Sequence, residues 1–182
     1  MPYSYLNDYT LADVTPVVEV ITVEEAKQYC RVTNSVENDL FADLIAQSRE
    51  AVEKAANLSL IPKTAIVYFN NEAGNFELPF GPIDKATLKV YDDNQNGIEL
   101  TTPTLKVIGD QFPKVAFPLY ANLRAEYETG YAVCPVELKI AMLDQINYGY
   151  ENRGMDVDDL GICKRLGVFA NAGHVQAQYY KL

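Results

Sequence analysis

The chain of 182 residues can bury a core as one domain, or as one domain with a sizeable insertion. Its 25 Asp and Glu residues against 15 Lys and Arg residues give a formal net charge of −10, which argues against tight binding along nucleic acid, because phosphates require cations. No apolar run is long enough to span a bilayer, and residues 1–20 lack the features of a signal peptide, so we expect a soluble chain made in the cytosol.

Residues 1–20 predict an extended N-terminal arm. They mix Tyr3, Tyr5, Tyr9 and Leu11 with polar residues and two prolines, and no helical period emerges. The tyrosines could pin such an arm to the body of the protein or to a neighbouring subunit. An ordinary packed terminus is an equal alternative.

Residues 21–61 contain two successive helical patterns. The first begins at Thr22, whose hydroxyl can accept a backbone N–H bond while Glu25 reaches back, as in a capping box. Val32-Thr33-Asn34 breaks this pattern. The pair of helices has one apolar stripe, which a later part of the chain must cover.

The second helix of this pair is the longer one. Its apolar residues recur near a period of 3.6, with charged residues between them. Ser35 or Asn38 can cap its beginning. Asn57 can end it, because Asn tolerates the left-handed conformation found just past helix ends.

The period changes from 3.6 to 2 over residues 62–131, which predicts roughly six antiparallel strands in a small sheet or partial barrel. Residues 76–80 alternate and can pair back on residues 64–69. Asn96-Gly97 is a strong hairpin signal, so we expect the strand after it to pair with the strand before it.

Cys134-Pro135 begins a third helix, since a proline in the first turn loses no hydrogen bond there. This helix is apolar on more than one face, so it is either wrapped by its own fold or partly buried against another subunit. Residues 156–166 predict a short fourth helix. Residues 169–182 form a polar tail that either adds as a strand to a partner's sheet edge or is disordered in the isolated protein.

Together these elements predict an α+β fold. Two N-terminal helices and one long C-terminal helix form a small bundle, and an antiparallel β subdomain is inserted between the second and third helices. The expected divisions are the arm at 1–20, a helical domain at 21–61 and 132–168, the β insertion at 62–131 and the tail at 169–182.

The sequence predicts no catalytic, cofactor or metal site. Asp92-x-Asn94-x-Asn96-Gly97 resembles the front of a calcium loop, but Pro103 stands where the bidentate acid belongs, so a hairpin turn is favoured. His174 is the single histidine and lies in the tail, away from any evident nucleophile. Cys30, Cys134 and Cys163 form no CxxC pair, and we interpret them as small, mostly buried, reduced residues.

Several stretches, in order, resemble the phage head–tail connector (adaptor) family, and together they cover about residues 20–155. Four of them are Ile21–Val32 (ITVEEAKQYCRV), Glu37–Glu53 (ENDLFADLIAQSREAVE), Glu128–Ala141, with ETGY, CP and LKIA, and Tyr150–Arg153 (YENR). Residues 81–93 are similar to the β insertion of the longer family members. The chain departs from the family's short ending after Arg153.

The resemblance implies a virion structural protein of a bacteriophage or prophage. Members of this family form commonly dodecameric rings beneath the portal protein, extend the DNA channel used in DNA packaging, and dock tail or stopper proteins. The expected partners are therefore further copies of this chain, the portal protein and a tail or stopper protein. DNA would pass through without specific binding, and no membrane is involved. The expected location is the virion neck, after assembly in the host cytoplasm.

The interface residues predicted for such a ring lie on the second and third helices and in the tail. They are Arg49, Glu50, Ile146, Tyr148, Tyr150, Glu151, Arg153, Tyr179 and Tyr180. Two other functions stay open from the sequence. One is another neck or tail-completion protein, and the other is a monomeric ligand- or partner-binding module that uses the β insertion.

Overall fold

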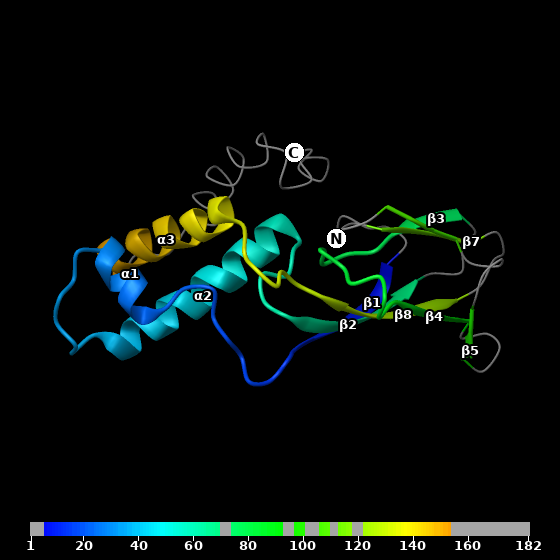
Figure 1. The fold of residues 1–182 in the computed structure, drawn as a ribbon, viewed down its shortest axis with the longest axis horizontal. Helices are drawn as coiled ribbons and strands as arrows, with labels where there is room; N and C mark the ends of the chain where they lie inside the picture. Colours follow the sequence, from blue (N-terminus) through cyan, green and yellow to red (C-terminus); the bar gives the residue numbers. More distant parts are fainter. Residues whose placement is uncertain are drawn as a thin grey trace. The chain divides into compact units, whose positions relative to one another are not determined.

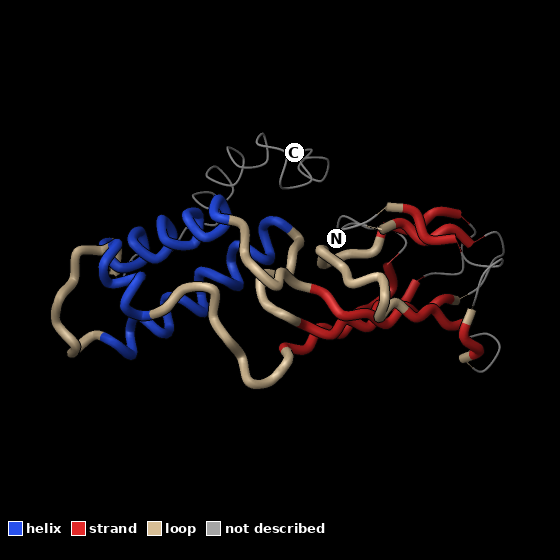
Figure 2. The backbone as a smooth tube through the Cα atoms, in the orientation of Figure 1, coloured by secondary structure: helices blue, strands red, loops and turns tan. Residues whose placement is uncertain are grey.

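The computed structural model describes residues 6–69, 74–92, 97–100, 106–109, 113–117 and 122–153. The chain divides into two units, one of residues 18–60 with 133–182 and one of residues 1–17 with 61–132. The described helices belong to the first unit and the described strands to the second, which gives the α+β fold that the sequence predicts (Figure 2). None of the described helices is both long enough and apolar enough to span a membrane.

The described part of the helical unit contains three helices: α1 (Val23–Tyr29), α2 (Asn38–Ala56) and α3 (Val136–Glu151) (Figure 1). The capping box predicted for α1 is confirmed, with the Glu25 amide 3.2 Å from the Thr22 hydroxyl and the Thr22 amide 3.0 Å from the Glu25 carboxylate. Asn57 ends α2 in the left-handed conformation, also as predicted.

The beginning of α2 differs from the prediction. Its N-cap is Glu37, and no side chain caps the helix there, so the expectation of Ser35 or Asn38 was wrong. The Glu37 carboxylate bonds to Tyr150 and Arg153 of the sequence-distant α3 end instead. Tertiary contacts therefore replaced the local cap at this position.

The core of the helical unit lies between α2 and α3. Phe41, Ile45 and Val52 of α2 are buried, and α3 buries Leu138, Ala141, Met142 and Ile146. Ser48 on α2 donates its hydroxyl to the Met142 carbonyl at 3.0 Å. The stripe predicted to need cover is thus covered by α3.

The described strands of the β unit form two antiparallel sheets. The larger sheet has the order β1-β2-β8-β4-β5 and the smaller has the order β3-β7-β6. The strand bounds are β1 (Leu6–Asp13), β2 (Lys63–Phe69), β3 (Gly74–Glu77), β4 (Lys89–Asp92), β5 (Ile98–Glu99), β6 (Lys106–Ile108), β7 (Lys114–Phe117) and β8 (Leu123–Thr129).

Alternation along β2 and β8 gives the larger sheet one buried face. Ala65, Val67 and Phe69 of β2 are buried, as are Leu123, Ala125 and Tyr127 of β8. The Tyr127 hydroxyl donates to the Pro79 carbonyl at 2.8 Å, which places the segment after β3 against this buried face.

Three strand predictions can be compared with this topology. β5 pairs with β4 across the predicted hairpin, which confirms that pairing, while residues 93–96 of its turn lie outside the described residues. β3 pairs with β7 in the smaller sheet, so the prediction that residues 76–80 pair back on β2 was wrong. The extended segment near the N-terminus is β1, which pairs with β2 from Leu6 to Asp13.

The proposed fourth helix and the tail lie outside the described residues.

Candidate assembly surfaces

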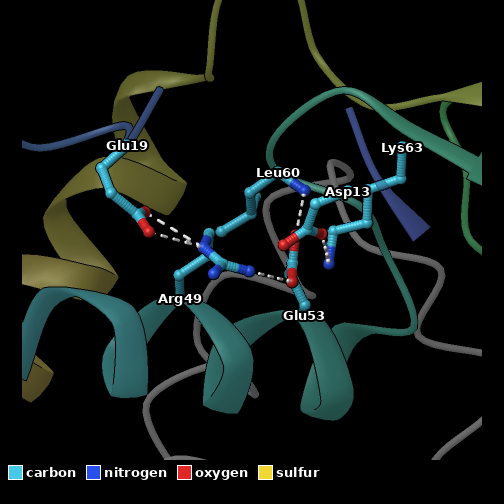
Figure 3. A network of polar contacts seen from close by, with 6 residues as sticks. All are labelled: Asp13, Glu19, Arg49, Glu53, Leu60 and Lys63. Atoms are coloured by element: carbon cyan, nitrogen blue, oxygen red, sulfur yellow. Dashed lines mark hydrogen bonds and ion pairs between the residues drawn. The ribbon is translucent and has the colours of Figure 1, made fainter. Parts of the chain in front are cut away.

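Arg49 is the centre of a buried polar network in the helical unit (Figure 3). Its Nε lies 3.0 Å from the Glu19 carboxylate, and its Nη1 lies 3.1 Å from the Glu53 carboxylate one turn further along α2. The second oxygen of Glu53 accepts the Leu60 amide at 2.7 Å. The network therefore fixes the chain before α1 and the chain after α2 to the same helix.

An ion pair lies within the β unit. The Lys63 ammonium at the start of β2 lies 3.3 Å from the carboxylate of Asp13 at the end of β1 (Figure 3). The two residues are direct partners in the strand register. Their opposite charges thus favour this register of the edge strand.

A second polar cluster, here called the α3 clasp, consists of Glu37, Phe41, Tyr150 and Arg153. Glu37 accepts the Tyr150 hydroxyl at 2.9 Å and the Arg153 Nη1 at 2.8 Å. The Tyr150 ring stacks on Phe41 with centroids 5.0 Å apart, and the Arg153 guanidinium lies 4.2 Å from the same tyrosine ring. The clasp holds the C-terminal end of α3 to the N-terminal end of α2.

Hydrogen bonds within the clasp shift the pKa values of its members. The bonds from Arg153 and Tyr150 lower the pKa of Glu37, because they favour its ionised form. The hydrogen bond between Tyr150 and Glu37 raises the pKa of Tyr150, and the hydrogen bond between Arg153 and Glu37 raises the pKa of Arg153. Each shift favours the charge state that keeps the clasp closed at neutral pH.

Two polar contacts join α1 to α3. The Lys139 ammonium lies 2.7 Å from the Glu25 carboxylate, and the Tyr29 hydroxyl donates to Asp144 at 2.7 Å. The bond from Lys139 is the largest of the effects that lower the pKa of Glu25. Glu25 therefore serves both the capping box of α1 and the contact between the helices.

The side of α3 opposite its buried face carries exposed apolar side chains. Val136 is 67% exposed and Ile140 is 42% exposed, and Val133, just before the helix, is 84% exposed. Because the third helix is apolar on more than one face, the sequence indicated that it is either wrapped by its own fold or partly buried against another subunit, but it did not single out these three residues as exposed.

The predicted interface residues occupy different environments. Arg49 and Ile146 are buried within the helical unit, where they support its own packing. Glu50, Glu151 and Arg153 are exposed, and Tyr148 and Tyr150 are half-buried. Tyr179 and Tyr180 lie outside the described residues. The interface assignment stays a prediction. Glu19 and Glu37, which hold Arg49 and Arg153, were missed, because both contacts join residues far apart in the sequence.

The thiols that the structure describes are poor nucleophiles at neutral pH. Burial raises the pKa of the Cys134 thiol to about 11. Burial and the nearby Glu151 raise the pKa of Cys30. Both side chains are half-buried, so the expectation that the cysteines are mostly buried holds only in part. Cys163 lies outside the described residues. Among the described residues, no group of three His, Cys, Asp or Glu side chains is placed to hold a metal ion.

No protein-family model and no curated protein matches the sequence. Several chains of solved structures are similar to it. One is a chain from the neck of an empty GTA particle computed with C6 symmetry, with a TM-score of 0.60 and 17% identity. Another comes from the virion of a native gene transfer agent (GTA) particle, with a TM-score of 0.58 and 18% identity. A third comes from the neck of a native GTA particle computed with C12 symmetry, with a TM-score of 0.51 and 17% identity.

Each of these matches covers 86% of this chain and at least 93% of the other chain. The likeness thus extends over both units and is not confined to one shared motif. Because the sequence identity is low, this likeness shows a shared backbone fold and nothing more. The chain therefore has the fold of proteins found in the necks of gene transfer agent particles.

Proposed function

We propose that this chain is a structural protein of the neck of a phage-like particle, where copies of it form a ring between the head and the tail. The observation that carries the proposal is the fold likeness to neck chains over 86% of the sequence. The motifs of residues 20–155, which resemble head–tail connectors, support the same assignment independently of the backbone comparison.

In this proposal the chain is an adaptor below the portal protein. It extends the DNA channel and offers a docking surface for a tail or stopper protein. The similar chains come from necks computed with C6 and C12 symmetry, which supports a ring of repeated copies. A net charge of −10 suits a channel through which DNA passes without adhering, because like charges repel.

The proposal gives the chain no catalytic role. Its polar clusters join structural elements: Arg49 links the segment of Glu19 to α2, Glu53 links Leu60 to the same helix, and the α3 clasp links two helix ends. Such pairs fix geometry, which is what a ring subunit requires of its helices. The protein would be made in the host cytoplasm and remain in the virion neck.

A tail-joining assay tests this function. Particles are produced from the genome that encodes this chain after deletion of its gene, and purified chain is then added to the heads. We expect the deletion to yield DNA-filled heads without tails, and the added protein to restore tail attachment. Normal, infectious particles from the deletion strain would contradict the proposal, as would a defect confined to head formation.

A further inference from the structure

Among the described residues of the helical unit, an apolar strip at the start of α3 stays exposed, and we propose that a second copy of this chain docks on it. The strip, here called the α3 ridge, consists of Val133, Val136 and Ile140. Val136 and Ile140 lie one helical turn apart and so share one side of α3, and Val133 lies just before the helix. This inference rests on the proposed function, since it names the surface through which subunits of the ring meet.

The α3 ridge takes no part in the packing among the described helices of the unit. At 100° per residue, Val136 and Ile140 point away from Leu138 and Met142, which are fully buried. Further along the same outward side, Asn147 is half-buried and Glu151 is exposed. The outward side of α3 is therefore apolar in its first turns and polar in its last, so the exposed apolar surface is confined to one place.

Polar groups beside the ridge already have partners within the unit. Lys139 lies next to Ile140 and is bound to Glu25, and Asp144 accepts the Tyr29 hydroxyl. A surface that covered the ridge would leave these groups paired. The desolvation penalty that usually opposes burial of charges is therefore reduced here.

The chemistry of the ridge selects a protein surface as its occupant. It contains no cation for phosphate binding, and its neighbour Lys139 is already engaged. Helices that lie on membranes carry Lys and Arg along their polar side, whereas the outward side of α3 ends in Asn147 and Glu151. An apolar strip with few charges matches the centre of a protein–protein interface.

A second copy of the chain is the occupant that fits the proposed ring. In a closed ring each subunit gives one surface to one neighbour and a different surface to the other. Every copy presents an α3 ridge in the same orientation relative to the ring axis, so one head-to-tail contact covers every ridge. The similar chains come from necks computed with C6 and C12 symmetry, which supports a contact that repeats between adjacent copies.

The test compares Val136→Asp and Ile140→Asp with Val36→Asp, each in the full chain. Val36 is 90% exposed and precedes α2, so it is a matched valine outside the ridge. The mass of each protein is measured by light scattering after size exclusion over a wide concentration range. Far-UV circular dichroism and the melting temperature check folding, and Val136→Ser and Ile140→Ser replace any aspartate variant that does not fold.

We expect wild type and Val36→Asp to assemble alike. Each ridge variant should weaken assembly by about tenfold or more, as expected when a charge is placed at the centre of an interface. Ridge variants that assemble like wild type would overturn the inference and leave the proposed function standing. A wild-type chain that stays monomeric up to millimolar concentration would also overturn it, whereas failure of the tail-joining assay would overturn the proposed function itself.

Discussion

Arg49 is a nearly buried guanidinium between two carboxylates, so its loss removes an ion pair from each of Glu19 and Glu53. We expect Arg49→Met, which keeps the apolar stem, to lower the free energy of unfolding by on the order of 3 kcal/mol. Urea denaturation followed by circular dichroism measures the change. Adding Glu53→Gln should restore part of the loss, since the amide oxygen can still accept the Leu60 amide.

The control for this network is Glu50→Ala, on the exposed side of the same helix. A surface substitution of this kind changes stability by about 0.5 kcal/mol or less. Equal losses for Arg49→Met and Glu50→Ala would contradict the role of Arg49 as the centre of the network.

Two buried serines differ in whether their hydroxyl has a hydrogen-bond partner. Among the buried side-chain polar atoms that the structure describes, the Ser59 hydroxyl stands without a hydrogen-bond partner, whereas the Ser48 hydroxyl donates to Met142. Ser59→Ala should raise the free energy of unfolding, because an unpaired buried hydroxyl costs about 1–3 kcal/mol. Ser48→Ala should lower it by about 1 kcal/mol. Urea denaturation measures both free energies of unfolding. A loss of stability in Ser59→Ala would mean that the Ser59 hydroxyl has a hydrogen-bond partner in the folded protein.

At the scale of elements, the α3 clasp predicts a pH dependence. The pKa of Glu37 is lowered in the folded chain by the bonds from Arg153 and Tyr150. Because the folded state then binds the proton less readily than the unfolded state, the clasp's contribution is complete above the ordinary glutamate pKa of about 4.3. It is lost as the pH falls through the lowered value. Glu37→Gln should therefore reduce stability at pH 7 and make its decline below pH 5 shallower.

Melting temperatures from pH 3 to pH 7 measure this difference, with Glu50→Gln as the control for removing one acidic charge. The prediction fails if wild type and Glu37→Gln lose stability in parallel over the acid range. An equal flattening in Glu50→Gln would instead assign the effect to net charge.

The connection between β8 and α3 depends on Gly130. Its φ is +117°, and a Cβ added there would lie 2.2 Å from the Ile61 carbonyl oxygen. Gly97 also has a positive φ, of +74°, but its nearest contact would be an Arg124 side-chain atom at 3.7 Å. We expect Gly97→Ala to cost about 1–2 kcal/mol for the left-handed backbone, and Gly130→Ala to cost distinctly more because the backbone must shift. Comparable unfolding free energies for the two variants would contradict this.

Elements that depend on neighbours in the sequence were predictable. The capping box of Thr22 and Glu25, the helix end at Asn57 and the β4–β5 pairing each arise from residues within a short stretch. The partner of β3 was not predictable, because the alternating pattern of a strand does not indicate which distant strand it pairs with. The contact of Glu37 with Arg153 joins residues 116 positions apart, so the periodic pattern of α2 could not reveal it.

The candidate surface on α3 could be predicted only in part from the sequence. The sequence indicated that α3 is apolar on more than one side. Only the packing separates the buried Ile146 from the exposed Ile140, because both fit a helical period. The position of α2 against α3 decides which of the two sides stays open, and that position depends on contacts between distant residues.

At the scale of the whole molecule, we expect the two units to have different roles in the proposed ring. The helical unit carries the α3 ridge and the polar clusters that keep its helices in place, so it is the unit expected to form the ring. The β unit carries short, exposed strands such as β6, whose Val107 and Ile108 are exposed. We propose that this unit provides surfaces for the neighbouring components of the neck.

The most direct test of a neck role is electron cryo-microscopy of the particles that the source genome produces, with the neck reconstructed at side-chain resolution. We expect a closed ring of copies of this chain between the portal protein and the tail, with each α3 ridge covered by the adjacent copy. A neck built from other chains, or copies of this chain found elsewhere in the particle, would contradict the proposed function.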